Sequence, residues 1–209
     1  MCASSARRVA GGALLALSLL VSGSCSSGDP EPAGAPSPTP IADLDTASVE
    51  LPRIAFCSLV PEADVAAALG GPARDGTSWG NGDELDLVSP GAAAGAGSAT
   101  EVVQEVGCAW TRGEVTARAW VFARPVTPAL ARGVVRQAGR ERGCRTPQGP
   151  GFGSPSLLQV CEADGQRRVR HAGLFGQTWL TCELAGPEVG DERAEQWCVT
   201  LVNSLDTAS

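Results

Sequence analysis

The sequence contains no lysine and no tyrosine, and it has a single histidine, His171. A Ser-His-Asp or Cys-His catalytic site would therefore have to use His171. Three arginines flank this residue in an expected strand, and positive neighbours disfavour the protonated imidazole that such a mechanism requires. We expect His171 to lie on a strand surface without a catalytic role.

Sequence motifs for nucleotide, phosphate or metal binding are missing as well. The chain has no G-x-S-x-G, H-E-x-x-H, P-loop or dinucleotide-binding signature. The cysteines form no C-x-x-C pair and have no histidine close by in the sequence. We predict no cofactor and no metal site, and no catalytic constellation points to an enzyme.

The amino terminus has the layout of a bacterial export signal. Arg7 and Arg8 precede an uncharged segment, residues 9–21, that is rich in alanine and leucine, and small residues then lead to Cys25. This apolar segment is short for a membrane-spanning helix, which needs about 20 residues. The two arginines favour a cytoplasmic start, so we expect everything after Cys25 to be exported.

The residues VSGSC, which end at Cys25, resemble the bacterial lipobox. In that motif the cysteine sulfur receives a diacylglycerol, and cleavage makes the cysteine the first residue. The resemblance implies removal of residues 1–24 and a lipid anchor on Cys25 at the outer face of the cell membrane. Two acyl chains suffice for stable anchoring. The alternative is an unmodified Cys25, with an uncleaved anchor or cleavage elsewhere.

The rest of the chain divides into a stalk and a domain. Residues 25–50 are rich in proline, alanine, serine and acidic residues, and this composition predicts a disordered stalk. Residues 51–209 are enough for a single domain with its own core. This domain has six cysteines: Cys57, Cys108, Cys144, Cys161, Cys182 and Cys198. An even number in an oxidising compartment predicts three disulfides, with many pairings open.

Hydropathy patterns predict an α+β domain with a largely antiparallel sheet and three helices packed on it. The expected helices cover residues 61–69, 128–142 and 188–205, and the expected strands cover residues 102–111, 114–123, 157–162, 166–172 and 177–184. Asp164-Gly165 predicts a hairpin. The clearest helical period belongs to Ala194, Trp197, Cys198, Leu201, Val202 and Leu205. We expect residues 89–100 to form a flexible loop.

Two segments resemble the signatures of an actinobacterial lipoprotein family, domain-of-unknown-function family 3558. They are CSLVPEADVAAALG at residues 57–70 and GCAW at residues 107–110. The resemblance covers about half of the domain and implies a disulfide between Cys57 and Cys108. The domain is also similar to extracellular sensor domains of mycobacterial receptor kinases, which implies ligand binding in a cleft. No activity follows, because family 3558 has none assigned.

The order of the expected elements favours local partners for the other four cysteines. Cys144 precedes the strand that contains Cys161, and Cys182 on the last strand can face Cys198 on the final helix. We therefore expect these two pairs, each closing a short loop that stabilises the fold by about 3 kcal/mol.

Charge is unevenly distributed along the chain. The net charge is −7, but residues 112–170 contain 11 arginines and four acidic residues. The overall acidity argues against nucleic acid as a partner. Arg132, Arg136 and Arg140 repeat at every fourth position of the second expected helix, opposite an apolar face with Leu130 and Val134. Such a row suits phosphate or carboxylate groups and is a candidate anion-binding face. The alternative is a solvent-exposed face paired with the domain's own acids.

These features favour a lipid-anchored envelope protein whose domain binds a small molecule or an envelope protein without catalysis. The alternatives are a hydrolase of cell-wall polymers and a purely structural lipoprotein. A pocket lined by Trp79, Trp110 or Trp120 would favour binding. Two carboxylates about 5–10 Å apart in a groove would favour hydrolysis. We expect the acidic clusters at residues 83–86 and 188–195 to be solvated surfaces.

Overall fold

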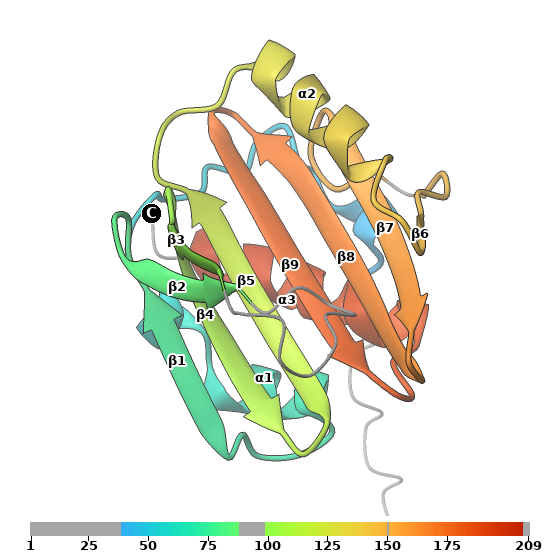
Figure 1. Ribbon diagram of the computed structural model, residues 1–209. Helices are drawn as coiled ribbons and strands as arrows, with labels where there is room; N and C mark the ends of the chain where they lie inside the picture. Colours follow the sequence, from blue (N-terminus) through green and yellow to red (C-terminus); the bar gives the residue numbers. More distant parts are fainter. Residues whose placement is uncertain (1–38, 88–98, 150, 207–209) are drawn as a thin grey trace, which may run out of the picture. The chain divides into compact units, whose positions relative to one another are not determined.

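A seven-stranded antiparallel sheet organises the folded part of the chain (Figure 1). The computed structural model describes residues 39–87, 99–149 and 151–206. The strand order is β1-β4-β5-β9-β8-β7-β6, and β2 and β3 form a separate two-stranded ribbon. The strands are β1 (Asp75–Trp79), β2 (Glu84–Leu87), β3 (Ala99–Val102), β4 (Glu105–Arg112), β5 (Val115–Phe122), β6 (Cys144–Arg145), β7 (Ser156–Ala163), β8 (Gln166–Phe175) and β9 (Thr178–Gly186). With the three helices described below, the fold is α+β, as the sequence predicts.

Tight turns connect the strands that are adjacent in the sequence. At the predicted β7–β8 hairpin, Asp164 and Gly165 have φ angles of 52° and 75°. Two successive residues with positive φ match the right-handed twist of the flanking strands, which explains why Asp-Gly occupies this turn. Gly113 and Gly176 have positive φ in the β4–β5 and β8–β9 turns. These turns set the register of the central strands.

Helices α1 (Glu62–Leu69) and α3 (Asp191–Asp206) cover one face of the sheet (Figure 1). We call it the α3 face. All six residues of the predicted apolar stripe of α3 are buried, which confirms the helical period. Trp197 lies edge-on to Trp110 of β4, with ring centroids 5.6 Å apart. No helix in the described part of the chain has the length and the hydropathy needed to cross a membrane.

Helix α2 (Pro128–Ala138) lies on the opposite face of the sheet, which we call the α2 face. Thr127 caps it by accepting a hydrogen bond on Oγ1 from the Leu130 amide at 3.3 Å, as expected for a threonine before a helical proline. The helix ends at Ala138 and not near Arg142, because Gly139 follows and the next residues form turns. The predicted apolar face is also partly wrong, since Leu130 is 52% exposed and Ala131 is the fully buried residue.

Three disulfides connect the elements: Cys57–Cys108, Cys144–Cys161 and Cys182–Cys198. The pairing agrees with the one implied by the family resemblance and with the two local pairs expected from the order of the elements. The first disulfide attaches the segment before α1 to β4, and the second joins the short edge strand β6 to β7. The third fixes α3 to β9 in the middle of the sheet. Each therefore links a peripheral element to the sheet.

The folded domain begins earlier than the predicted boundary at residue 51. Ile41, in a short 3-10 helix (Ile41–Asp43), is fully buried, and its amide donates to Glu195 of α3 at 2.8 Å. Val49 is buried as well. The end of the expected stalk, residues 25–50, thus packs on the domain, because Ile41 and Val49 supply apolar side chains to its core. Cys25, residues 1–24 and residues 26–38 lie outside the described residues.

Strands β1, β2, β3 and the two-residue β6 were not predicted from the sequence. In β1 only Trp79 is buried, so the strand has no alternating hydropathy pattern to identify it. Ala99 and Thr100, the end of the expected loop at residues 89–100, belong to strand β3. The rest of that expected loop, residues 89–98, lies outside the described part of the chain. Edge strands with polar side chains give little sequence signal, because neither side needs to be apolar.

Candidate ligand-binding pocket

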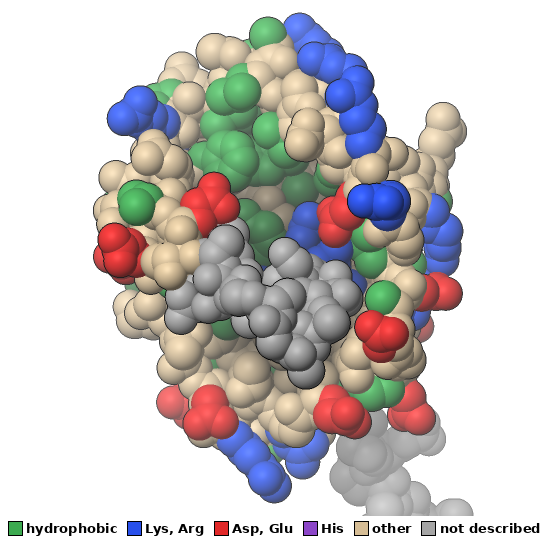
Figure 2. Space-filling model, viewed as in Figure 1, with side chains coloured by type: hydrophobic (Ala, Val, Ile, Leu, Met, Phe, Trp, Pro, Cys, Tyr) green, Lys and Arg blue, Asp and Glu red, His purple; other side chains and the backbone are tan. Residues whose placement is uncertain are grey.

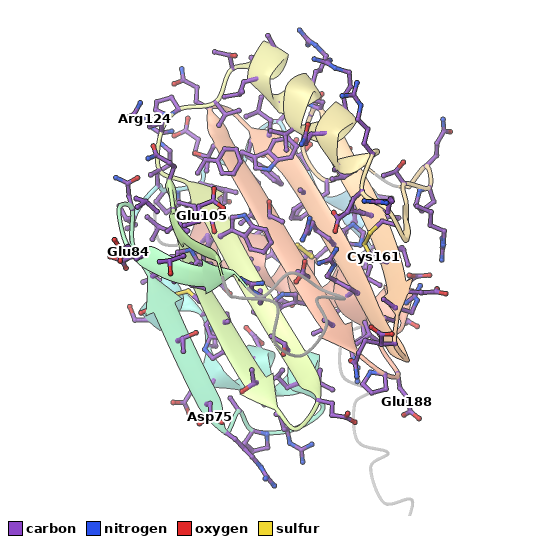
Figure 3. The ribbon with its side chains drawn as sticks, in the orientation of Figure 1. Asp75, Glu84, Glu105, Arg124, Cys161 and Glu188 are labelled. Atoms are coloured by element: carbon purple, nitrogen blue, oxygen red, sulfur yellow. A yellow bond between two sulfur atoms is a disulfide. The ribbon has the colours of Figure 1, made fainter. Side chains whose placement is uncertain are left out.

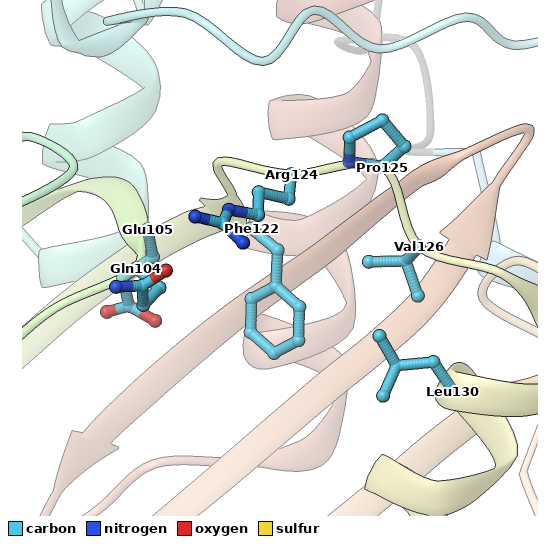
Figure 4. A pocket seen from close by; sticks show the side chains of 7 residues that line it. All are labelled: Gln104, Glu105, Phe122, Arg124, Pro125, Val126 and Leu130. Atoms are coloured by element: carbon cyan, nitrogen blue, oxygen red, sulfur yellow. The ribbon is translucent and has the colours of Figure 1, made fainter.

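A pocket of about 150 Å³ lies between the start of β4, the end of β5 and the first turn of α2 (Figure 4). Its lining residues are Gln104, Glu105, Phe122, Arg124, Pro125, Val126 and Leu130. Backbone hydrogen bonds fix its frame: Ala123 donates to Gln104 at 3.0 Å, and Val126 donates to Gln177 at 2.8 Å. These hydrogen bonds fix the segment that connects β5 to α2, and the pocket lies beside this segment.

The wall of the pocket on the α2 side is apolar. Phe122, Val126 and Leu130 face the same space (Figure 4), and apolar side chains gather on this part of the surface (Figure 2). Leu130 is one of the few large apolar side chains that the described domain exposes. Apolar side chains gathered around a hollow, one of them exposed, are typical of a binding site.

The opposite wall contains the carboxyl group of Glu105. Glu105 pairs with Phe122 across β4 and β5, and its Oε1 accepts a hydrogen bond from Trp79 Nε1 at 3.1 Å. Burial raises the pKa of Glu105, although this hydrogen bond and the charges of Arg118 and Arg170 oppose the shift. Arg124 lies at the same end of the sheet as Glu105 (Figure 3). The pocket thus combines one partly desolvated carboxyl group with an apolar wall and an exposed guanidinium group.

A row of arginines and tryptophans supports Glu105 from the centre of the α2 face. The Arg118 guanidinium lies 5.5 Å from the ring centroids of both Trp79 and Trp120, and Arg170 lies 5.5 Å from Trp120. Such cation–π contacts stabilise by about 0.5–2 kcal/mol each. Gly107 lies beneath the two indoles, where any Cβ would collide with the Trp79 ring. The row holds the indole that donates to Glu105.

Ion pairs on the α2 face lie between these arginines and tryptophans and strand β7. Glu183 is 3% exposed, and its Oε2 accepts hydrogen bonds from Arg170 at 2.7 and 2.9 Å. Gln159, fully buried, accepts from Arg170 and donates to Glu141, which also pairs with Arg168 at 2.5 Å. The arginines of β8 are therefore held by the domain's own acids.

The Glu141 carboxylate also lies within 4.8 Å of the sulfurs of Cys144 and Cys161. Both sulfurs belong to a disulfide, and Arg168 Nη2 lies 3.1 Å from the Cys161 sulfur. A bonded sulfur is not a thiolate ligand, and a cation occupies the remaining space. The cluster is therefore an ion pair beside a disulfide and not the donor set of a metal site.

Arg132, Arg136 and Arg140 form an exposed row along α2, visible as a blue band in Figure 2. Arg140 lies in the turn after Ala138, so the row extends beyond the helix. The ion pairs among the described residues involve Arg145 and three arginines of β8. No residue of the α2 row takes part in them. The structure thus brings the three predicted residues together on a surface, separate from the pocket.

The expectation of a surface histidine is wrong. His171 is 3% exposed, its ring lies edge-on to Phe152 at 6.0 Å, and burial lowers its pKa to about 4. Position 171 alternates with Arg168 and Arg170 on β8, so its side chain points to the α3 face while theirs point to the α2 face. The flanking arginines suggested exposure, but they are themselves paired with acids.

The predicted acidic clusters have local structural roles. Asp83 accepts a hydrogen bond from the Gly80 amide at 2.7 Å, and Asp191 pairs with Arg167 at 2.6 Å. Among the tryptophans named as markers, Trp110 lines a second cleft of about 710 Å³ beside α1, and Trp79 and Trp120 belong to the row on the α2 face. The residues of the smaller pocket escaped prediction because Leu130 was assigned to the core and Glu105 to an ordinary strand.

No protein-family model and no curated protein matches this sequence, so membership of family 3558 stays a prediction. Among solved structures, the chain is similar to the extracellular domain of PknH from Mycobacterium tuberculosis. The alignment covers 72% of this chain and 94% of that chain, with 14% identity and a TM-score of 0.43.

Proposed function

We propose that this protein is a lipid-anchored, extracytoplasmic binding protein whose domain holds a small ligand, without catalysis, in the pocket formed by β4, β5 and α2. The observation that carries the proposal is the pairing of an apolar wall, formed by the exposed Leu130, the half-buried Phe122 and the buried Val126, with the raised-pKa carboxyl group of Glu105. Apolar pockets with a few polar groups are typical of sites that bind and orient small molecules.

Two features support the location. The domain contains three disulfides and no free cysteine in its described part, as is typical of exported proteins. The VSGSC motif supports an anchor on Cys25. In cells of the native host, the full chain should fractionate with membranes, whereas the Cys25→Ala variant should lose its lipid mass and leave that fraction. A Cys25→Ala variant that stays in the membrane with the same mass would contradict the anchor.

The lining residues favour a ligand with a short apolar body and a hydrogen-bond donor. A volume of about 150 Å³ accommodates a short aliphatic or aromatic group rather than a whole lipid or peptide. A carboxylate only accepts hydrogen bonds, so Glu105 suits an amine or hydroxyl group, and a cationic amine most of all. A ligand carboxylate would face repulsion at Glu105, and Arg124, the other charged lining residue, is exposed, so water and salt screen its attraction for an anion.

The hydrolase alternative finds less support in this pocket. A glycosidase needs two carboxyl groups facing each other across the substrate. Glu105 is the one carboxylic acid among the seven lining residues of the pocket. The lining therefore favours binding over hydrolysis.

The ligand class can be tested with three six-carbon probes that differ in their head group: hexylamine, hexanol and hexanoate. Saturation-transfer NMR on the full chain should give the strongest signal for hexylamine, a weaker one for hexanol and the weakest for hexanoate. Leu130→Gln should weaken all three signals, and Glu105→Gln should remove the preference for the amine. Leu59→Gln, which changes an exposed leucine outside this pocket, serves as the control. Equal signals in wild type and Leu130→Gln would overturn the pocket assignment.

A further inference from the structure

The arginine row, Arg132 and Arg136 on α2 and Arg140 just after it, is a basic surface on an acidic protein, and no ion pair with another described residue neutralises it. Arg132 and Arg136 are four residues apart on the helix, about 6 Å along its axis, and Arg140 follows in the turn after Ala138. All three side chains are exposed. Residues 124–145 contain six arginines and a single acidic residue, Glu141, in a chain of net charge −7.

The one acidic residue of this segment does not neutralise the row. Glu141 is bound by Arg168 at 2.5 Å and by Gln159 at 3.0 Å, and it lies 3.9 Å from Arg170. These partners are on the sheet, so the charge of Glu141 is directed inward. No ion pair between described residues includes an arginine of the row. The positive charge of the row is therefore available to an external anion.

We propose that the arginine row docks the domain on an anionic lipid surface, the outer face of the membrane to which the chain is anchored. The proposal rests on the lipid anchor put forward above. From Cys25 to Thr39, the first described residue, the chain has 14 residue steps and spans at most about 50 Å. The anchor therefore keeps the domain within reach of lipid phosphates, and guanidinium groups bind phosphate oxygens through paired hydrogen bonds.

Charge complementarity also sets the orientation. A basic residue close to an anionic lipid surface strengthens association about fivefold, so three give about a hundredfold for a domain already tethered. The acidic remainder of the domain is repelled by the same surface. The α2 row is thus the side that we expect to face the lipid, and high salt should release it.

Docking through this row leaves the pocket accessible. Leu130, which lines the pocket, is two residues before Arg132, which places the two side chains about 200° apart around the helix. A domain lying on its arginines would present the pocket to the side, away from the lipid headgroups. The two surfaces of α2 can therefore work at the same time.

The test uses the full, lipidated chain inserted through its anchor into preformed vesicles. One set contains phosphatidylcholine alone, and the other contains phosphatidylglycerol and phosphatidylcholine. Phenylglyoxal modifies exposed arginines, and mass spectrometry reports the rate at each residue. We expect Arg132, Arg136 and Arg140 to react at least about fivefold more slowly on the anionic vesicles, with recovery at high salt. Arg74 and Arg112, both exposed near the opposite end of the sheet from α2, should react equally on both.

A pair of matched variants separates docking from general charge effects. Neutron reflectometry on an anionic supported bilayer should place the domain of Arg132→Gln/Arg136→Gln farther from the lipid than wild type. Arg74→Gln/Arg112→Gln removes the same charge elsewhere and should leave the distance unchanged. Equal modification rates on both vesicle types would overturn docking while leaving the anchor intact. The same holds if the arginines are protected by added soluble polyphosphate but not by the anionic vesicles. Failure of the chain to stay on either vesicle would overturn the anchor, and docking with it.

Discussion

The two faces of the sheet use the same strands but are stabilised by different interactions. On the α3 face, Ala119, Val121 and Leu180 are fully buried against helices, so burial of apolar area dominates. On the α2 face, the neighbouring positions of these strands carry Arg118, Trp120 and Glu183, which form cation–π contacts and ion pairs, and only a smaller apolar cluster packs against α2. The first face holds the fold together, and the second positions the groups around the pocket.

The largest effect should come from the α3 face. Trp197 is 1% exposed, contacts Trp110, and donates its indole N–H to the Arg118 carbonyl at 3.3 Å. We expect Trp197→Ala to lower the free energy of unfolding by about 4 kcal/mol, because a large cavity forms and a hydrogen bond is lost. Urea titration followed by circular dichroism measures this. A loss below about 1 kcal/mol would mean that this face is not the main source of stability.

Breaking an ion pair on the α2 face should have the next largest effect. Glu183→Ala removes the carboxylate that Arg170 binds at 2.7 Å and leaves it only that of Glu141 at 3.9 Å, and we expect a loss of about 3 kcal/mol in the same urea titration. The double variant Arg170→Met/Glu183→Leu replaces the pair with apolar side chains of similar size. It should unfold within about 1 kcal/mol of wild type, since the unpaired charge is gone. A double variant as unstable as Glu183→Ala would show that the pair itself is essential.

His171 makes the α3 face sensitive to acid. Its pKa is lowered by burial from 6.5 to about 4 in the folded domain. The unfolded chain therefore binds a proton at higher pH than the folded one, so stability falls as the pH drops from about 6.5 to about 4. The loss amounts to about 3 kcal/mol by the low end of this range. His171→Gln should flatten the pH dependence of the unfolding free energy in this window, and an unchanged slope would contradict the assignment.

The contrast between the faces also explains which features the sequence could predict. The period of Trp197, Leu201 and Leu205 marks α3, because a helix that buries one stripe repeats its apolar residues regularly. Asp164-Gly165 fixes a hairpin for an equally local reason. The buried state of His171 was hidden, because its environment is set by strand pairing and by Phe152, a residue 19 positions earlier.

The pocket could not be predicted from the sequence, because it too depends on tertiary structure. Glu105, Phe122 and Leu130 come from three elements that meet only after the sheet has formed. Each one has an ordinary local explanation in the sequence, as a strand or helix residue. The arginine row was predictable, because Arg132, Arg136 and Arg140 repeat within one segment. Whether the domain's own acids neutralise the row depends on tertiary structure.

The smallest effect should come from the pocket carboxyl. Burial raises the pKa of Glu105 in the folded domain, so folding favours its protonated form, and the ionised form weakens the fold once the pH rises above that pKa. Glu105→Gln removes the charge and keeps an oxygen that can accept the hydrogen bond from Trp79. We expect a gain in unfolding free energy at neutral pH, below about 1 kcal/mol because the side chain is only partly buried. The gain should vanish under acid conditions, where the wild-type carboxyl is also neutral. A loss of stability at neutral pH would instead show that Arg118 and Arg170 stabilise the carboxylate more than burial penalises it, so the pKa of Glu105 would not be raised, although the ionised group would still suit an amine.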